Sequence, residues 1–430
     1  MFQPPKGMRD FLPDQARKRQ WMLDQIRAVF ARYGYGLLET PVVESWELLA
    51  AKSSGDGIKD EIYSFKDKGD RELGLRFDLT VPTARVIAAN PQFPKPFRRA
   101  QIGPVYRYDN PQAGRFREFL QCDADVFGVS TMAAEAELLA LAVDALTALG
   151  FSAFSIRLNN RKILNDLLNK LTIPATTAPA VFRALDKLEK IGEAAVREEL
   201  AGVLKQQQID ELFAVVRLTG SPDQLLKKVE KQLPGDGVLE LKELVAAAKK
   251  LSPMMIIDFS LVRGLDYYTG PIFEISIASK NNIGSVAGGG RYDKLVEQYG
   301  GKDTPATGIS LGFERLYEIM DAEKRFPATL DQGATVLVAG IGNDPAVARE
   351  VDVVAAALRN DGIATVVDLL GRDLKKQLHS ANSQKIPFVV VIGEEEQKTK
   401  KFTLKDMTTG KQAKVPLTAL IAGLKKRAAF

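Results

Sequence analysis

Apolar side chains follow two different periods along the first part of the 430-residue chain. After Asp14 they recur at helical spacing, and Gly34 follows the last of them, which predicts an amphipathic helix of about 20 residues with Asp14 as its cap. Shorter stretches bounded by Gly, Pro and Asp then predict strands. These strands cover residues 36–45, 61–67, 72–82, 99–108 and 115–127, and the segment DNPQAG joins the last two as a turn.

The helical period returns in the middle of the chain. Residues 132–150 predict a helix, and a Leu-, Ala- and Lys-rich segment at about 163–250 predicts a mainly helical insertion. Strands resume at residues 254–259 and 272–277. Because runs of strands and runs of helices are separated in this way, we expect an α+β fold with an antiparallel sheet edged by helices.

A change in composition at residues 325–334 predicts a linker, so we expect one domain at residues 1–325 and a second at residues 334–430. The second domain contains apolar runs that alternate with helices starting near Asp344 and Arg372. This alternation predicts a small α/β domain with parallel strands. The runs lie at residues 335–342, 363–370 and 387–393.

Composition narrows the class of protein. With 45% apolar and 26% charged residues the chain is typical of a globular protein, and we find neither a membrane-spanning run nor a signal core, so we expect a cytoplasmic protein. The one cysteine, Cys122, excludes internal disulfides and cysteine-rich zinc sites. The one histidine, His379, is predicted on a surface helix, so catalysis must depend on carboxylates, arginines, tyrosines or a bound metal.

Two glycine-containing segments need separate interpretations. Gly340 and Gly342 are followed by Asp344 and Pro345, which favours a helix cap over a dinucleotide fingerprint. The segment AGGGRYD at residues 287–293 predicts either a loop with positive φ or a backbone that a ligand approaches closely, and the sequence leaves both open. No GxxxxGK[ST] motif occurs, so any ATP must be held without a P-loop.

Arginines and acids cluster on the predicted strands and turns, which favours an anionic ligand over a random surface distribution. Arg107, Asp109, Arg115 and Arg117 lie on one hairpin. Arg315 opens a helix beside a glycine-containing strand, where a guanidinium and helix-terminal N–H groups together suit phosphate. The net charge of +5 is a mild indication of polyanionic partners.

Six motifs, taken in order, resemble those of the histidyl-tRNA synthetase family of class II aminoacyl-tRNA synthetases. Residues 97–128 are similar to class II motif 2, and TGISLGFERL at 307–316 is similar to motif 3. The family-specific segments are KGMRDFLP, LRFDLTVP, RGLDYYTG and AGGGRYDKL. The resemblance implies a class II antiparallel-sheet catalytic domain with a helical insertion, followed by a C-terminal α/β anticodon-binding domain.

The resemblance also implies an activity and its ligands. Family members activate L-histidine with ATP and Mg²⁺ to histidyl-adenylate and pyrophosphate, then transfer histidine to the 3′ end of tRNA(His). The segment LLETPVVES is similar to motif 1, which implies a homodimer. The 15 Lys and Arg against 11 Asp and Glu in residues 331–430 fit contact with tRNA, although a solvated lysine-rich surface is also an adequate explanation.

The site residues are carried over by position in the motifs. Arg263 and Arg107 are expected to be catalytic, on the α-phosphate and the histidine carboxylate. The expected histidine-binding residues are Asp78, Leu79, Thr80, Arg107, Gln121, Asp125, Arg263, Tyr267 and Tyr268. The expected ATP-binding residues are Arg107, Asp109, Arg115, Phe119 and Arg315, and Gln112 and Arg117 are expected to meet the tRNA acceptor end. No side-chain metal ligand is predicted, and Asp266 is expected to tether Arg263 or its turn.

Two other classes of protein are alternatives to a histidine-activating synthetase. A non-catalytic relative, such as the regulatory subunit of an ATP phosphoribosyltransferase, would be expected to lack the anticodon-binding region or pocket residues, and this chain keeps both. A class II synthetase for another amino acid would lack RGLDYYTG and the spacing of Gln121 and Asp125. One departure is Asp109, where many family members carry glutamate, and this change affects the expected ATP contact.

Overall fold

The computed structural model describes residues 2–51, 60–110, 114–262, 267–278, 284–327, 330 and 333–428. Its internal contacts divide the chain into two compact units, Met1–Phe11 with Arg19–Arg325 and Leu12–Lys18 with Phe326–Phe430. Within the described ranges, no helix has the length and apolar character to cross a membrane.

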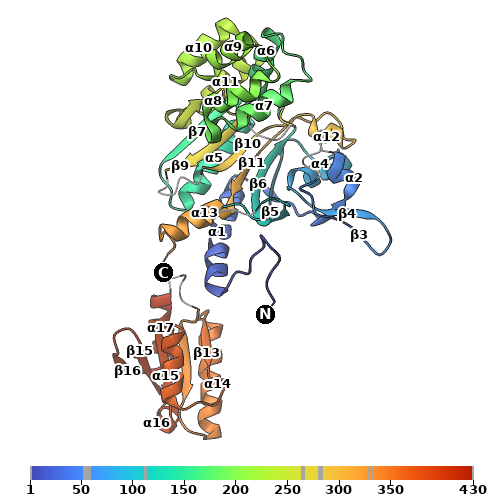
Figure 1. The fold of residues 1–430 in the computed structure, drawn as a ribbon. Helices are drawn as coiled ribbons and strands as arrows, with labels where there is room; N and C mark the ends of the chain where they lie inside the picture. The colour runs from blue at the N-terminus through green and yellow to red at the C-terminus, as the bar shows by residue number, and fades with distance from the viewer. Residues whose placement is uncertain are drawn as a thin grey trace. The chain divides into compact units, whose positions relative to one another are not determined.

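A large sheet forms the centre of the first unit (Figure 1). Its eight strands among the described residues lie in the order β1-β5-β6-β11-β10-β9-β7-β8. Neighbours are antiparallel except for the pairs β1–β5 and β7–β8. In sheet order the bounds are Gly36–Leu37, Phe97–Tyr106, Glu118–Phe127, Ala306–Gly312, Ser285–Arg291, Pro271–Ile277, Phe154–Asn160 and Met255–Ile257.

A smaller sheet and several helices flank the large one. The smaller sheet has the order β2 (Val43–Ser45), β4 (Glu72–Leu75), β3 (Ser64–Lys66). The flanking helices are α1 (Pro13–Arg32), α2 (Trp46–Ala51), α4 (Thr80–Ala89), α5 (Ala133–Ala148), α12 (Leu295–Gln298) and α13 (Phe313–Ala322). Helix α1 buries one apolar face, as its spacing predicts. It begins at Pro13, which suits a first helical position, so Asp14 lies in the first turn and is not the cap.

The expected strand at residues 72–82 is wrong in its second half. Strand β4 ends at Leu75, and helix α4 begins at Thr80. The Oδ1 of Asp78 accepts a hydrogen bond from the backbone N–H of Val81 at 3.0 Å. This bond satisfies one of the free N–H groups of the first helical turn, so a single aspartate converts an apolar stretch into a helix start.

Residues 161–247 of the first unit are mainly helical, and their helices lie beside strands β7 and β9 (Figure 1). Their apolar spacing buries leucines and valines between the helices, for example Leu167, Leu212 and Leu226. The helices are α6 (Arg161–Lys170), α7 (Ala178–Asp186), α8 (Leu188–Ala201), α9 (Gln206–Val216), α10 (Pro222–Gln232) and α11 (Asp236–Ala247), with a 3₁₀ helix η1 (Lys249–Met254) leading back to the sheet.

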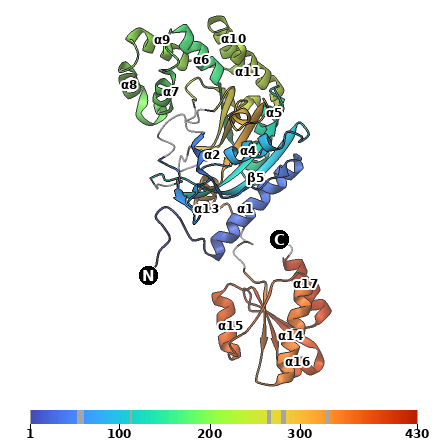
Figure 2. The same cartoon turned by 90° about the vertical axis from the view of Figure 1, so that its right-hand side faces the viewer.

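The second unit has a five-stranded sheet in the order β13-β12-β14-β15-β16. Helices α14 and α17 pack on one face and α15 on the other (Figure 2). Its strands are β12 (Val336–Gly340), β13 (Thr365–Val367), β14 (Phe388–Ile392), β15 (Lys401–Asp406) and β16 (Gln412–Pro416). Its helices are α14 (Pro345–Asn360), α15 (Leu374–Ser383), α16 (Glu394–Thr399) and α17 (Leu417–Ala428).

The expectation of parallel strands in the second unit is only partly correct. Strands β13, β12 and β14 are parallel, whereas β15 and β16 add an antiparallel hairpin. The hairpin strands carry exposed or half-exposed residues at most positions, so they lack the apolar run that marks a buried strand. The predicted α+β class, with an antiparallel-rich sheet and a C-terminal domain that has its own sheet, is confirmed.

Candidate active site

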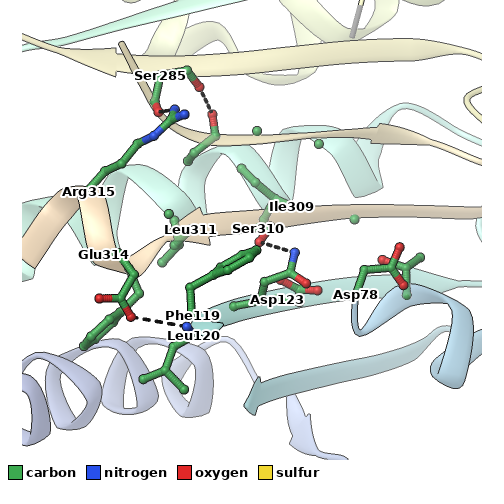
Figure 3. A pocket seen from close by; sticks show the side chains of 18 of the residues that line it. Asp78, Phe119, Leu120, Asp123, Ser285, Ile309, Ser310, Leu311, Glu314 and Arg315 are labelled. Atoms are coloured by element: carbon green, nitrogen blue, oxygen red, sulfur yellow. Dashed lines mark hydrogen bonds between the residues drawn. The ribbon is translucent and has the colours of Figure 1, made fainter. Parts of the chain in front are cut away.

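Strand β6 places three polar side chains on one face of the large sheet. Gln121, Asp123 and Asp125 are two residues apart, so their side chains point to the same side of the strand. All three line a cavity of about 610 Å³. Figure 3 shows Asp123 in this cavity, with Arg315 toward one end and Asp78 toward the other.

The buried end of this face contains an ion pair. Arg99 on β5 lies opposite Asp125, and its guanidinium is 2.8 Å from the Asp125 Oδ2. Arg99 is fully buried, and Tyr292 donates a hydrogen bond to the other carboxylate oxygen of Asp125. A paired and hydrogen-bonded carboxylate of this kind can stay ionised where an isolated one could not.

The glycines of the neighbouring strands make room for these groups. A Cβ on Gly308 would lie 1.9 Å from the Asp125 Oδ1, and one on Gly290 would lie 2.8 Å from the Tyr268 ring. The AGGG segment is therefore part of strand β10, and its glycines 288–290 have no positive φ, so the expected alternative of a positive-φ loop is wrong. Close approach of backbone and side chains is the reason for glycine here.

The start of helix α4 closes one side of the cavity. Asp78 and Thr80 line it, and Asp78 is held by its bond to the Val81 N–H. Leu79, between them, does not line the cavity, because its side chain is fully buried in the core. The bond to the first turn of α4 thus holds the Asp78 carboxylate in place where it lines the cavity.

Three tyrosines form an aromatic group on the cavity wall. The rings of Tyr267 and Tyr268 have centroids 4.9 Å apart, and Tyr267 meets Tyr292 edge-on at 5.6 Å. Each of the three lines the cavity. Such rings offer a flat apolar surface together with hydroxyl groups, which suits a planar, polar ligand such as an imidazole.

Arginines supply the cationic part of the cavity. Arg107 donates from its Nε to the Phe77 carbonyl at 3.2 Å, and its guanidinium lies over the rings of Phe77 at 4.3 Å and Phe119 at 5.2 Å. Burial lowers the pKa of Arg107 from its ordinary value. Arg315 donates to the Ser285 carbonyl at 2.6 Å. Fixed cations beside apolar rings suit phosphate groups and a stacked base.

An ion cluster joins the N-terminal segment to helix α13. Glu314 accepts hydrogen bonds from Arg19 at 2.7 and 2.8 Å, from Arg9 at 2.6 Å and from the Leu120 backbone at 3.3 Å. Glu314 and Arg19 are almost fully buried. The cluster therefore holds Glu314, the residue before Arg315, against strand β6. This role was not predicted from the sequence.

Burial also changes the acids of strand β6. It raises the pKa of the Asp123 carboxyl to about 7 and raises that of Asp125, while Arg99 opposes both shifts. Asp123, Arg99 and Tyr292 were not among the predicted site residues. The spacing between Gln121 and Asp125 could have indicated Asp123. Arg99 lies on β5 and Tyr292 directly follows β10, so only the assembled sheet brings them to Asp125.

Most of the predicted site residues meet in this one cavity. Those that line it are Asp78, Thr80, Arg107, Asp109, Arg115, Phe119, Gln121, Asp125, Tyr267, Tyr268 and Arg315. Leu79 and Arg117 do not line it; the Arg117 guanidinium stacks on Tyr108 at 3.9 Å. Arg263, Asp266 and Gln112 lie outside the described residues, so their predicted roles stay predictions.

The large antiparallel sheet and its cavity of acids, tyrosines and arginines have the architecture of the class II aminoacyl-tRNA synthetases. A sequence model described as histidyl-tRNA synthetase matches residues 7–316, and one described as anticodon binding domain matches residues 335–427.

Individual relatives agree with these matches. The chain is 39% identical to a histidine–tRNA ligase of Gloeobacter violaceus, over 97% of each chain, and 37% identical to one of Aeropyrum pernix, over 98% of each. The crystal structure of histidyl-tRNA synthetase from Nostoc sp. PCC 7120 superposes with a TM-score of 0.84 at 32% identity and covers 99% of both chains. The chain therefore belongs to the histidyl-tRNA synthetase family.

Proposed function

We propose that this chain activates L-histidine with ATP to give histidyl-adenylate and pyrophosphate, and then transfers the histidyl group to the 3′ end of tRNA(His). The observation that carries the proposal is that one cavity contains both kinds of binding group. Carboxylates at Asp78 and Asp125 suit the cationic and N–H groups of histidine, and Arg107 and Arg315 suit phosphate.

Histidine is recognised at both of its polar ends in this proposal. Asp78, Thr80 and Gln121 accept hydrogen bonds from the α-ammonium group. Asp125, which is paired with Arg99, accepts a hydrogen bond from the N–H of one imidazole nitrogen. Tyr267 and Tyr268 flank the ring. An isostere without those N–H groups leaves buried polar atoms unpaired, which gives discrimination of about 10⁴ to 10⁵ in comparable sites.

Activation proceeds by attack of the histidine carboxylate on the α-phosphorus of ATP, with pyrophosphate as the leaving group. Arg107 holds the carboxylate and α-phosphate together, and Arg315 holds the outer phosphates. Phe119 stacks on adenine, with Arg115 and Asp109 beside it. The arginines act because negative charge increases on the phosphate oxygens in the transition state. Arg263 is expected to share the task of Arg107.

Magnesium accompanies the nucleotide in this proposal. Glu61 and Asp109 line the cavity, and their oxygens are donors that Mg²⁺ prefers. Within the described ranges no group of three or more His, Cys, Asp or Glu could hold a metal ion. The nucleotide phosphates would hold the ion, Glu61 and Asp109 are the carboxylates that could assist, and the ion would neutralise phosphate charge.

The second half of the reaction requires the rest of the chain. We propose residues 1–325 as the catalytic domain and 334–430 as the anticodon-binding domain, with Arg117 and Gln112 near the acceptor end of the tRNA. A homodimer in the cytoplasm is also part of this proposal. Light scattering of the purified protein at micromolar concentration should give twice the mass of one chain.

Amino-acid-dependent ATP–pyrophosphate exchange, run with each of the twenty amino acids, tests the activation step. We expect exchange with L-histidine alone. Arg107→Ala should reduce it about 10²- to 10³-fold, because a transition-state cation is lost. Arg217→Ala, which removes an exposed arginine paired with Glu193 in the helical insertion, is the matched control and should leave exchange unchanged. No exchange with histidine would overturn the proposal.

A further inference from the structure

Asp123 is a buried carboxylate in the cavity to which no role has been assigned above. It lies between Gln121 and Asp125 on the same face of β6, and it is only 3% exposed. Its Oδ1 has no hydrogen-bond partner among the residues that the structure describes. A buried polar atom without a partner is costly, and when it lines a ligand cavity the ligand is the natural source of that partner.

The surroundings of Asp123 are defined on three strands. Across the sheet it lies opposite Ser310 on β11 and Gln101 on β5. The Ser310 hydroxyl donates to Asp123 and accepts from the Gln121 amide at 3.4 Å. The side-chain amide of Gln101 donates instead to the Thr40 hydroxyl at 2.8 Å, and the Oδ1 of Asp123 receives no hydrogen bond from it.

Charged groups face Asp123 from every side of the cavity. Asp125 on the same strand and Asp78 before α4 are the anionic neighbours. Arg99 on β5 is the main cationic neighbour, and it is paired with Asp125. Arg107 and Arg76 also interact with Asp123, although Arg76 is bonded to the carbonyls of Pro104 and Thr40. Arg107 interacts with Asp78 as well, and both acids line the same cavity.

We propose that Asp123 is a further histidine-binding residue, which together with Asp78 accepts hydrogen bonds from the α-ammonium group of the substrate and loses its proton when histidine binds. The inference rests on the proposed function, because it assumes histidine as the ligand. Two carboxylates so placed repel each other, which favours the protonated form of Asp123 in the free protein, and an ammonium group between them removes the repulsion. Gln121 and Ser310 then orient the pair.

A pH dependence of binding follows from this arrangement. In the free protein, burial and the neighbouring acids raise the pKa of Asp123 to about 7, so much of it is protonated at neutral pH. A bound ammonium favours the carboxylate form and lowers the pKa again. The contribution of Asp123 to affinity is therefore full above pH 7 and decreases as the pH falls through this value.

The test measures the Kd of L-histidine by calorimetry at pH 5.5, 7 and 8 for wild type and Asp123→Asn, which has nearly the same shape. At pH 8 the variant should bind about 10-fold or more weakly, because a charge-assisted hydrogen bond is lost. At pH 5.5 the two Kd values should approach each other, because protonated aspartate and asparagine are alike. The protonation of free histidine changes with pH in the same way in both experiments. The ratio of the two Kd values therefore reports on residue 123 alone.

A second ligand identifies the end of histidine that Asp123 contacts. 3-(Imidazol-4-yl)propanoate lacks the ammonium group and should bind wild type and D123N equally. Asp123→Glu, which keeps the carboxylate, should retain the pH dependence. Asp144→Asn, the same change on an exposed aspartate of α5, should behave as wild type at every pH.

Two results would overturn the assignment. One is a D123N to wild-type ratio of Kd that does not change with pH, which indicates a structural role alone. The other is an equal loss of affinity for the deaminated analogue. Histidine-dependent exchange by wild type separates this inference from the proposed function: if exchange occurs but D123N binds histidine as wild type does, only the role of Asp123 fails.

Discussion

Strand β6 of the large sheet and strand β14, the middle strand of the C-terminal sheet, carry opposite kinds of side chain. β6 carries Gln121, Asp123 and Asp125 on one face, opposite the buried Arg99, whereas β14 carries only Phe, Val and Ile between residues 388 and 392. Both strands lie inside a sheet with helices packed against it. The difference is that one face of β6 borders a ligand cavity, while β14 borders only the cores under α14 and α15.

The two strands differ in how much their side chains contribute to the stability of the fold. An apolar strand such as β14 contributes about 25 cal/mol for each Å² that it buries, with no desolvation penalty for charges. A buried ion pair such as Arg99–Asp125 roughly balances its own desolvation and is often replaceable by apolar residues without loss of stability. The proposed function accounts for the charged face of β6 by ligand binding, so substitutions there should separate stability from activity.

The largest expected effect is that of Arg99→Met. Removal of the guanidinium leaves Asp125 buried without its cation, so the free energy of unfolding should fall by about 3–5 kcal/mol. Urea denaturation measures this change. The double variant R99M/D125M should recover most of the stability and yet fail to bind histidine. Arg217→Met, in an exposed pair, should change the free energy by less than about 0.5 kcal/mol. A stable R99M single variant would contradict this account.

Arg315→Ala should lower the rate of histidine-dependent exchange about 10²- to 10³-fold, because the proposed function places Arg315 on the outer phosphates of ATP. Its side chain lines the cavity and donates to the Ser285 carbonyl. Steady-state kinetics should show the loss in kcat/KM, with the urea midpoint close to that of wild type. If the midpoint fell in parallel with the rate, Arg315 would be a structural residue.

Gly308→Ala places a methyl group 1.9 Å from the Asp125 Oδ1, so the carboxylate or the strand must move. We expect a loss of about 1–3 kcal/mol in stability and a rise in the Kd of histidine. Gly423→Ala is the matched control in the C-terminal unit, since a Cβ there meets nothing within 4 Å and the residue is in helix α17. That variant should gain up to about 1 kcal/mol. Calorimetry measures the Kd of histidine and urea denaturation measures the stability of each variant. Equal effects of the two substitutions would contradict the close packing of Gly308 against Asp125.

Asp123→Asn should stabilise the free protein at alkaline pH. Because the folded-state pKa of Asp123 is raised to about 7, its contribution to stability is complete below the unfolded-state pKa and is lost as the pH rises through 7. The gain in stability of the variant over wild type should therefore be about 2–3 kcal/mol larger at pH 8 than at pH 5. Urea denaturation at the two pH values measures it, and a difference that is independent of pH would contradict the shift.

The smallest effect is expected for His379→Ala. His379 is exposed on α15 in the C-terminal unit, and surface substitutions of this kind change stability by less than about 0.5 kcal/mol. Exchange activity should be unchanged, because the first reaction step depends on the other unit. A marked loss of exchange would show that the only histidine of the chain has a role that neither its sequence pattern nor its exposure indicates.

Much of the fold was predictable from periodicity because that signal is local. The helix after Asp14, the hairpin of β5 and β6 and the parallel strands of the C-terminal unit all follow from spacing and turn residues. The errors occurred where one contact overrides the local pattern. The start of helix α4 depends on the bond between Asp78 and Val81. The β15–β16 hairpin depends on pairing at the edge of a sheet, and half-exposed strands have no apolar run from which the sequence could predict them.

By itself the sequence determined the family, the fold class and most of the residues that line the cavity, because motif residues and their order are properties of the chain. Only the tertiary structure decided which side chains face one another. Sheet register placed Arg99 opposite Asp125 and Ser310 opposite Asp123, and close packing required glycine at 308. Register and burial are nonlocal, so the partners of Asp125 and the buried Oδ1 of Asp123, unpaired among the described residues, can be identified only once the strands are brought together.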